Sequence, residues 1–78
     1  MNDLSKKIKT RFLKSKDIFI TAKNLEKEGY TIVGGIYDAS KEIWYMNVFK
    51  DNNKIVQVLY SFRHDESNYK QFIHSILY

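Results

Sequence analysis

The chain contains no cysteine, no proline and no long apolar run, and these absences exclude several classes of protein. Without cysteine it can form neither a disulfide nor a thiolate zinc site, so side-chain packing must stabilise its 78 residues. No stretch approaches the about 18 apolar residues of a membrane-spanning helix. The lysine-rich start lacks the apolar segment of a signal peptide, so the sequence predicts a cytoplasmic protein with no membrane partner.

The length predicts a single domain over residues 1–78, because too little sequence remains for a second core. A domain of this size buries only about 60% of the surface that its unfolded chain exposes. The aromatic content of 15% suits such a domain, since each ring buries a large area. An alternative in which the basic helix 3–14 forms a separate arm stays open.

Two apolar stripes with helical spacing open the chain. Leu4, Ile8 and Phe12 recur every four residues and therefore lie on one face of a helix. A second stripe follows at Ile18, Ala22 and Leu25. The segment 3–28 is thus one bent helix or two helices, and we favour two.

The boundaries of the second helix have recognisable capping residues. Ser15 and Asp17 are both suitable N-caps, because a short side-chain oxygen can accept hydrogen bonds from the first free backbone amides. Gly29 stands where a left-handed residue ends a helix, and Tyr30 stands where an apolar residue folds back onto it. We therefore expect this helix to end at Glu28.

From Tyr30 the apolar pattern changes to a period of two. Segments 30–37, 42–50 and 54–63 are rich in Ile, Val, Tyr, Phe and Trp and predict three strands. Residues 38–41 and 51–54 supply the turns, the second because asparagine tolerates the positive φ of a tight hairpin. The sequence predicts an antiparallel meander.

The last segment has the spacing of a helix packed on a core. Its apolar residues fall at i, i+3, i+4, i+7 and i+8, and Asp65 or Ser67 is placed to cap its start. These residues are Tyr69, Phe72, Ile73, Ile76 and Leu77. The expected fold is therefore α+β, with an N-terminal helix or helix pair, a three-stranded meander sheet and a C-terminal helix, in the order α-β-β-β-α.

Both faces of the predicted sheet are apolar, so something should cover each. A hairpin loop of two or four residues at the Asn52–Asn53 pair joins odd positions of one strand to even positions of the next. One face then carries Ile43, Tyr45, Asn47, Phe49, Val56, Val58, Tyr60 and Phe62, with Tyr30, Ile32 and Ile36. The other face is the candidate protein-binding surface, and it carries Val33, Tyr37, Trp44, Met46, Val48, Ile55 and Leu59. In the alternative interpretation the flanking helices cover both faces.

The net charge of +4 lies entirely in the first quarter of the chain. Residues 1–17 contain six basic and two acidic side chains, and the remaining residues contain seven of each. These cations are candidates for nucleic-acid binding through phosphates, or else they form the solvated face of a helix. They are Lys6, Lys7, Lys9, Arg11, Lys14 and Lys16.

Catalytic motifs are scarce. Gly34-Gly35 lacks the rest of a phosphate-binding loop and is interpreted as a bulge or a place of close backbone approach. His64-Asp65-Glu66, with His74, is the one cluster suited to acid–base or metal chemistry, but adjacent side chains on one segment diverge. We therefore predict no enzyme activity, no metal and no cofactor, and keep a His64-based enzyme as a third hypothesis.

The predicted order from residue 16 to 78 is similar to that of the double-stranded-RNA-binding domain. That family contacts phosphates with lysines at the start of its last helix, where this chain has Asp65-Glu66-Ser67-Asn68, and it has a proline-containing loop that is missing here. The resemblance is one of topology, and RNA binding is not inferred from it.

The first functional hypothesis is a small non-catalytic protein that binds or inhibits another protein, or pairs with a second copy of itself. In size and composition it resembles the small accessory proteins of phages and mobile elements, including anti-CRISPR inhibitors. The alternative is a nucleic-acid-binding module that uses the basic N-terminal helix.

Overall fold

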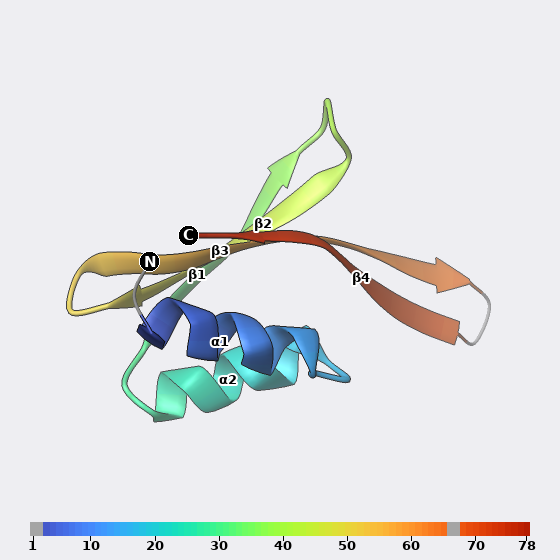
Figure 1. The fold of residues 1–78 in the computed structure, drawn as a ribbon. Helices are drawn as coiled ribbons and strands as arrows, with labels where there is room; N and C mark the ends of the chain where they lie inside the picture. The colour runs from blue at the N-terminus through green and yellow to red at the C-terminus, as the bar shows by residue number, and fades with distance from the viewer. Residues whose placement is uncertain (1–2, 66–67) are drawn as a thin grey trace.

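The computed structural model describes residues 3–65 and 68–78. Its helices and strands follow in the order α1 (Asp3–Leu13), α2 (Ile18–Lys27), β1 (Thr31–Asp38), β2 (Ile43–Lys50), β3 (Asn53–Asp65) and β4 (Asn68–Leu77). The strands form one antiparallel sheet in the order β1-β2-β3-β4, and both helices lie against the same side of it (Figure 1). The α+β class and the antiparallel meander are confirmed, whereas the α-β-β-β-α order is wrong in its last element.

The two-helix interpretation of the N-terminal segment is confirmed. Asp17 is the N-cap of α2, where its Oδ1 accepts hydrogen bonds from the amides of Phe19 at 2.9 Å and Ile20 at 3.4 Å. Gly29 has a φ of 100° just after α2, and the Tyr30 amide donates back to the Leu25 carbonyl at 3.0 Å. This is the expected glycine-ended C-cap, and it turns the chain into β1.

Helix α1 packs against β3, and helix α2 packs against β1. The residues of both predicted apolar stripes are buried between the helices and the sheet, except Leu4, which is only partly buried. A buried hydrogen bond from Ser5 Oγ to the Ile55 carbonyl, 3.0 Å long, also joins α1 to β3. The core therefore lies between one helix layer and one face of the sheet.

The C-terminal helix that the spacing predicted is strand β4 instead. It pairs antiparallel with β3, and the register shifts between Leu59 and Tyr60, which leaves His74 as an extra residue in β4. An extra residue in a strand brings Ile73 and Ile76, three apart, to the same covered side. A helical spacing and a bulged strand therefore give the same pattern of apolar residues. Ser67, one of the two predicted caps, lies outside the described residues, and Asp65 ends β3 rather than capping a helix.

Each of the three strand pairings contains one such irregularity. In β1 it lies at Gly34-Gly35, where Gly35 has a φ of 76°, so the bulge interpretation of this pair is confirmed. In β3 it lies at Ile55, between the pairs Phe49–Lys54 and Val48–Val56. Beyond that bulge even residues of β2 pair with even residues of β3, so the predicted composition of the two faces is wrong. The loop has two residues, which is one of the two predicted lengths, but it is Asp51-Asn52, with φ of 51° and 67°, one residue before the predicted Asn52–Asn53 pair.

Candidate functional site

The side of the sheet that faces away from the helices is the main candidate site. Val33, Asn47, Gln57 and Leu77 form one row across the four strands, and Ile36, Tyr45, Leu59 and Ser75 form the next. Ile43 and Phe72 extend the same side toward the β1–β2 turn. We call this surface the open face, because no helix of the described residues lies over it (Figure 1).

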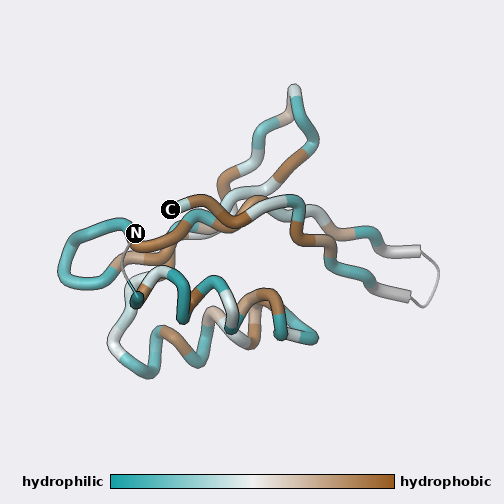
Figure 2. Tube along the Cα trace, in the orientation of Figure 1, coloured by the Kyte–Doolittle hydropathy of each residue, from teal (hydrophilic) through white to brown (hydrophobic). Residues whose placement is uncertain are grey.

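The open face is apolar and carries no charge in its two central rows. Four of its apolar residues are more than two-fifths exposed, namely Val33, Ile36, Phe72 and Leu77. A hollow of about 280 Å³, bounded by Thr31, Val33, Phe49 and Asn52, lies at its far end. Figure 2 shows the hydrophilic turns lying outside the central, more apolar part of the strands. Exposed apolar surface of this extent is typical of an interaction site.

Two polar features lie within this apolar surface. Asn47 Oδ1 is inaccessible to solvent, and no hydrogen-bond partner for it is found among the described residues. Ser61 Oγ and His74 Nε2 are 2.7 Å apart and form a hydrogen bond between β3 and the bulged residue of β4. The amide oxygen of Asn47 is therefore the polar atom of this face that still lacks a donor.

The seven residues predicted as one protein-binding surface do not share a face. Met46, Val48 and Ile55 are buried in the core beneath the helices, and the bulge at Ile55 places Leu59 on the other side of the sheet. Val33 and Leu59 lie on the open face. Tyr37 and Trp44 lie on the helix side, beyond the part that the helices cover. The alternation within β2 did separate Tyr45 from Trp44, but the sequence indicated only one of the three bulges that set the strand partners, the one at Gly34-Gly35.

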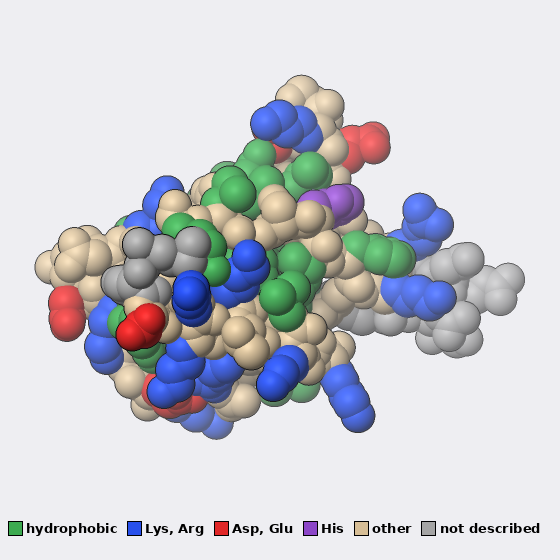
Figure 3. Space-filling model, viewed as in Figure 1, with side chains coloured by type: hydrophobic (Ala, Val, Ile, Leu, Met, Phe, Trp, Pro, Cys, Tyr) green, Lys and Arg blue, Asp and Glu red, His purple; other side chains and the backbone are tan. Residues whose placement is uncertain are grey.

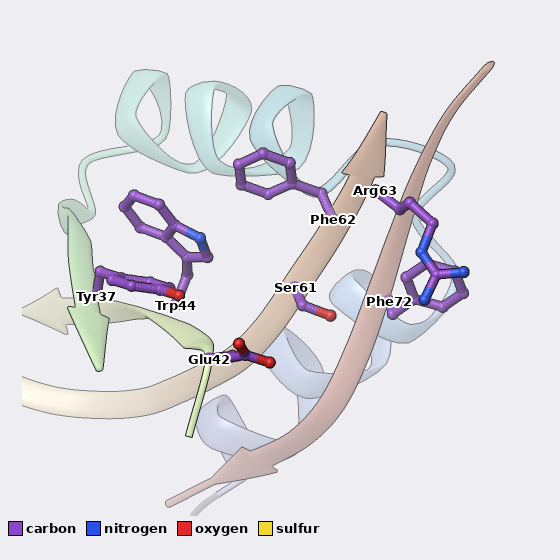
Figure 4. Close-up of a pocket in the computed structure, with 7 residues that line it drawn as sticks. All are labelled: Tyr37, Glu42, Trp44, Ser61, Phe62, Arg63 and Phe72. Atoms are coloured by element: carbon purple, nitrogen blue, oxygen red, sulfur yellow. The ribbon is translucent and has the colours of Figure 1, made fainter. Parts of the chain in front are cut away.

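Tyr37 and Trp44 belong to a row of aromatic rings in contact, of which only Trp44 and Phe62 are stacked. The ring centroids of Tyr37 and Trp44 are 4.7 Å apart, and those of Trp44 and Phe62 are 5.8 Å apart. Phe19 of α2 continues the row, 6.4 Å from Phe62. A hollow of about 300 Å³ opens beside these rings, between the two hairpins, where Arg63 lies next to Phe72 (Figure 4). The contact between Trp44 and Phe62 holds the start of β2 against β3. The hollow beside the rings is a second, smaller candidate site.

The helix layer carries the positive charge. Residues 3–28 contain eight basic and four acidic side chains, and residues 29–78 contain five of each. Figure 3 shows lysine and arginine side chains gathered over the helices. The excess of positive charge therefore lies in the helix layer, on the side opposite the open face.

The six predicted phosphate-binding cations are not equivalent. Arg11 forms a two-pronged ion pair with Glu28, 2.7 and 2.8 Å long, which lowers the pKa of the Glu28 carboxyl and raises that of the guanidinium. The Lys9 ammonium lies 5.3 Å from the ring centroid of Tyr78. Exposed cations remain at Lys6, Lys7, Lys14 and Lys16.

The predicted acid–base cluster falls mostly outside the described part of the chain. Glu66 and the side chains of His64 and Asp65 are not among the described residues. In the parts that are described, 3–65 and 68–78, no group of three metal-ligating side chains comes together. Neither described helix is long and apolar enough to cross a membrane.

The order α-α-β-β-β-β also removes the topological resemblance to the double-stranded-RNA-binding domain, since its last helix is replaced by β4. Comparisons of the chain with protein-family models, with curated proteins and with solved structures find no match, so its function has to be argued from these surfaces.

Proposed function

We propose that the protein acts by binding another protein through the open face of its sheet and catalyses no reaction. The observation that supports this is an apolar face that spans all four strands, with no charge in its central rows and no helix over it in the described residues. A monomeric domain usually covers such a face, because exposed apolar surface is costly in water. The face also carries Tyr45, and tyrosine is one of the residue types that dominate binding energies.

The broader class that we propose is that of small inhibitor proteins encoded by phages or mobile elements, of which anti-CRISPR proteins are examples. Its support is the size of the chain, its composition and the presence of one large apolar surface. An inhibitor of this kind needs only a surface complementary to its target, and it needs no catalytic group.

The test compares two variants with the same substitution on opposite sides of the molecule. Ile36 lies on the open face and is 44% exposed, and Ile20 lies on α2 and is 58% exposed. Tagged wild type, Ile36→Lys and Ile20→Lys are used to capture partners from host cells, and each captured protein is then purified and titrated by calorimetry. We expect the affinity for the partner to fall at least about tenfold in Ile36→Lys and to stay unchanged in Ile20→Lys. Equal affinity of all three proteins for the partner would contradict the proposal.

A second candidate function is nucleic-acid binding by the helix layer, which is favoured by the confinement of the net charge to residues 3–28. Phosphate contacts of this kind are sequence-independent and weaken steeply with salt. Replacement of Lys6, Lys7 and Lys14 by Glu should then abolish a mobility shift of DNA or RNA at low salt, whereas Ile36→Lys should leave it intact. An absence of any shift for the wild type at about 0.05 M salt would exclude this function.

A further inference from the structure

We propose that the protein which occupies the open face is a second copy of this chain, docked face to face about a two-fold axis parallel to the strands. The inference rests on the proposed function, because it names the partner of the same surface. Three features of the face are self-complementary about that axis: its charged ends, its central amides and its apolar rows.

The geometry of such a pair follows from symmetry. A two-fold axis that runs parallel to the strands, midway between β2 and β3, places β1 of one copy over β4 of the other and β2 over β3. Facing sheets that pack in an aligned manner keep their strands within about 30° of each other. Each row of the open face therefore lies over the same row of the second copy, with the strand order reversed, so that the β1 residue of a row faces the β4 residue of that row.

The charges at one end of the open face match under this operation. Asp38 and Glu42 lie at the β1–β2 turn, and Arg63 and Lys70 form a pair in the neighbouring part of β3 and β4. Both groups lie at the same end of the strands, on opposite halves of the sheet. Lys41 lies at the same turn, so the turn carries a net charge of −1. The two-fold axis sets this turn of each copy over the Arg63–Lys70 pair of the other, so two net attractions form.

The central amides also match. The axis places Asn47 of one copy over Gln57 of the other, and the reverse. An amide side chain both donates and accepts, so the same pair of residues can form a hydrogen bond at both places. Asn47 Oδ1 is inaccessible to solvent and has no donor within the described residues, so the amide contact with the second copy does not depend on this atom.

The size of the face predicts a weak, reversible dimer. Four strands about 4.8 Å apart, and about 3.3 Å per residue along them, give a face of roughly 19 by 17 Å. Two such faces, with the relief of their side chains, bury roughly 1,000 Å², which is the lower limit for a specific interface. We therefore expect a dissociation constant of about 10 to about 100 µM.

Sedimentation equilibrium from about 2 to about 500 µM protein tests this expectation. The mean mass should rise from 9.3 kDa toward twice that value, and Ile36→Lys should raise the dissociation constant at least about tenfold. Ile20→Lys, the matched control on the helix layer, should dimerise like the wild type. A monomer at every concentration, or a dimer that Ile36→Lys does not weaken, would overturn the inference.

A mixing experiment tests the axis itself. Glu42→Lys and Arg63→Glu should each weaken the dimer, because each substitution places like charges opposite each other twice. A mixture of the two variants should dimerise again, since Lys at position 42 of one copy then faces Glu at position 63 of the other, and the native pair faces at the second place. Contacts within one chain cannot produce this rescue. A mixture that stays monomeric would refute the two-fold arrangement.

The dimer and the proposed function can fail separately. A chain that stays monomeric, but whose purified cellular partner binds wild type and not Ile36→Lys, would refute the dimer and retain the function, with a different protein on the open face. If Ile36→Lys changes neither dimerisation nor the affinity for a cellular partner, the dimer and the proposed function are both refuted.

Discussion

Gln71 links the last strand to the first turn of α2, and its replacement should weaken the domain in a pH-dependent way. Its side-chain amide donates to Asp17 Oδ1 at 2.9 Å, and its oxygen accepts from the Ile18 amide at 2.7 Å. Gln71 therefore supports both the N-cap carboxylate and one of the free amides of the helix start.

The magnitude follows from these two hydrogen bonds. A hydrogen bond to a charged group contributes about 1.5–3 kcal/mol when buried, and both side chains here are only half-buried, so we expect Gln71→Ala to cost about 1–2 kcal/mol at pH 7. For a domain of this size that corresponds to a fall in Tm of about 5–15 °C. Gln57→Ala on the open face is the matched control, and it should change stability by less than about 0.5 kcal/mol at low protein concentration.

The pH dependence identifies the cause. The hydrogen bond from Gln71, with those from Phe19 and Ile20, lowers the pKa of Asp17 although partial burial opposes this. A lowered folded-state pKa gives stability that is complete above the unfolded value of about 3.9 and is lost as the pH falls through the folded value. The difference between wild type and Gln71→Ala should therefore shrink as Asp17 is protonated. Gln71→Glu should behave in the opposite way from wild type and gain stability as the pH falls from 7, because two adjacent carboxylates raise each other's pKa.

Urea unfolding at pH 7, 5 and 3, followed by the fluorescence of Trp44, measures these differences. A loss in Gln71→Ala that is equally large at pH 7 and pH 3 would refute the charge-assisted hydrogen bond as its origin. If Gln71→Ala is as stable as the wild type at pH 7, the hydrogen bonds of Gln71 to Asp17 and to the Ile18 amide do not stabilise the domain.

Two further pairs of neighbouring residues give internally controlled predictions. Gly35→Ala should destabilise the domain by about 1 kcal/mol, because the φ of Gly35 is 76°. Gly34→Ala should be nearly neutral, since the added carbon would lie in ordinary contact, 4.0 Å from the Met46 side chain. Thermal unfolding of both variants measures the difference. Phe12→Ala should lower the free energy of unfolding by about 3–5 kcal/mol, because the ring is 0% exposed. Leu13 is 58% exposed, so Leu13→Ala should lower it by less than about 0.5 kcal/mol. Urea unfolding measures both, and equal effects at the two positions would contradict the burial of α1 on the sheet.

The sequence was sufficient for the features that depend on local chemistry. The stripe through Ile8 and Phe12, the cap at Asp17 and the glycine end at Gly29 all lie where they were predicted, because each depends on residues within one or two helical turns. The first three strands and both turns were likewise predicted to within a few residues.

The features that the sequence did not reveal depend on bulges. The extra residue at His74 made a strand look like a helix, and the extra residue at Ile55 placed Val56 and Val58, rather than Leu59, beside Met46 and Val48. Gly34-Gly35 indicated the bulge in β1, but the bulges at Ile55 and His74 depend on how two strands and the layer beneath them fit together, and no local residue pattern indicates them. The open face was therefore assigned to the wrong residues, although the prediction that both faces of the sheet are apolar was correct.

The bulges at Gly34-Gly35 and His74 lie in β1 and β4, the two outermost strands of the sheet. An outer strand with regular spacing is a template on which further chains can stack without limit, and this is the usual route from a small β-rich protein to fibrils. One extra residue in each outer strand breaks that repeat. Stacking of further chains along β1 and β4 is therefore disfavoured, whereas a face-to-face contact about a two-fold axis closes on itself and ends with a pair.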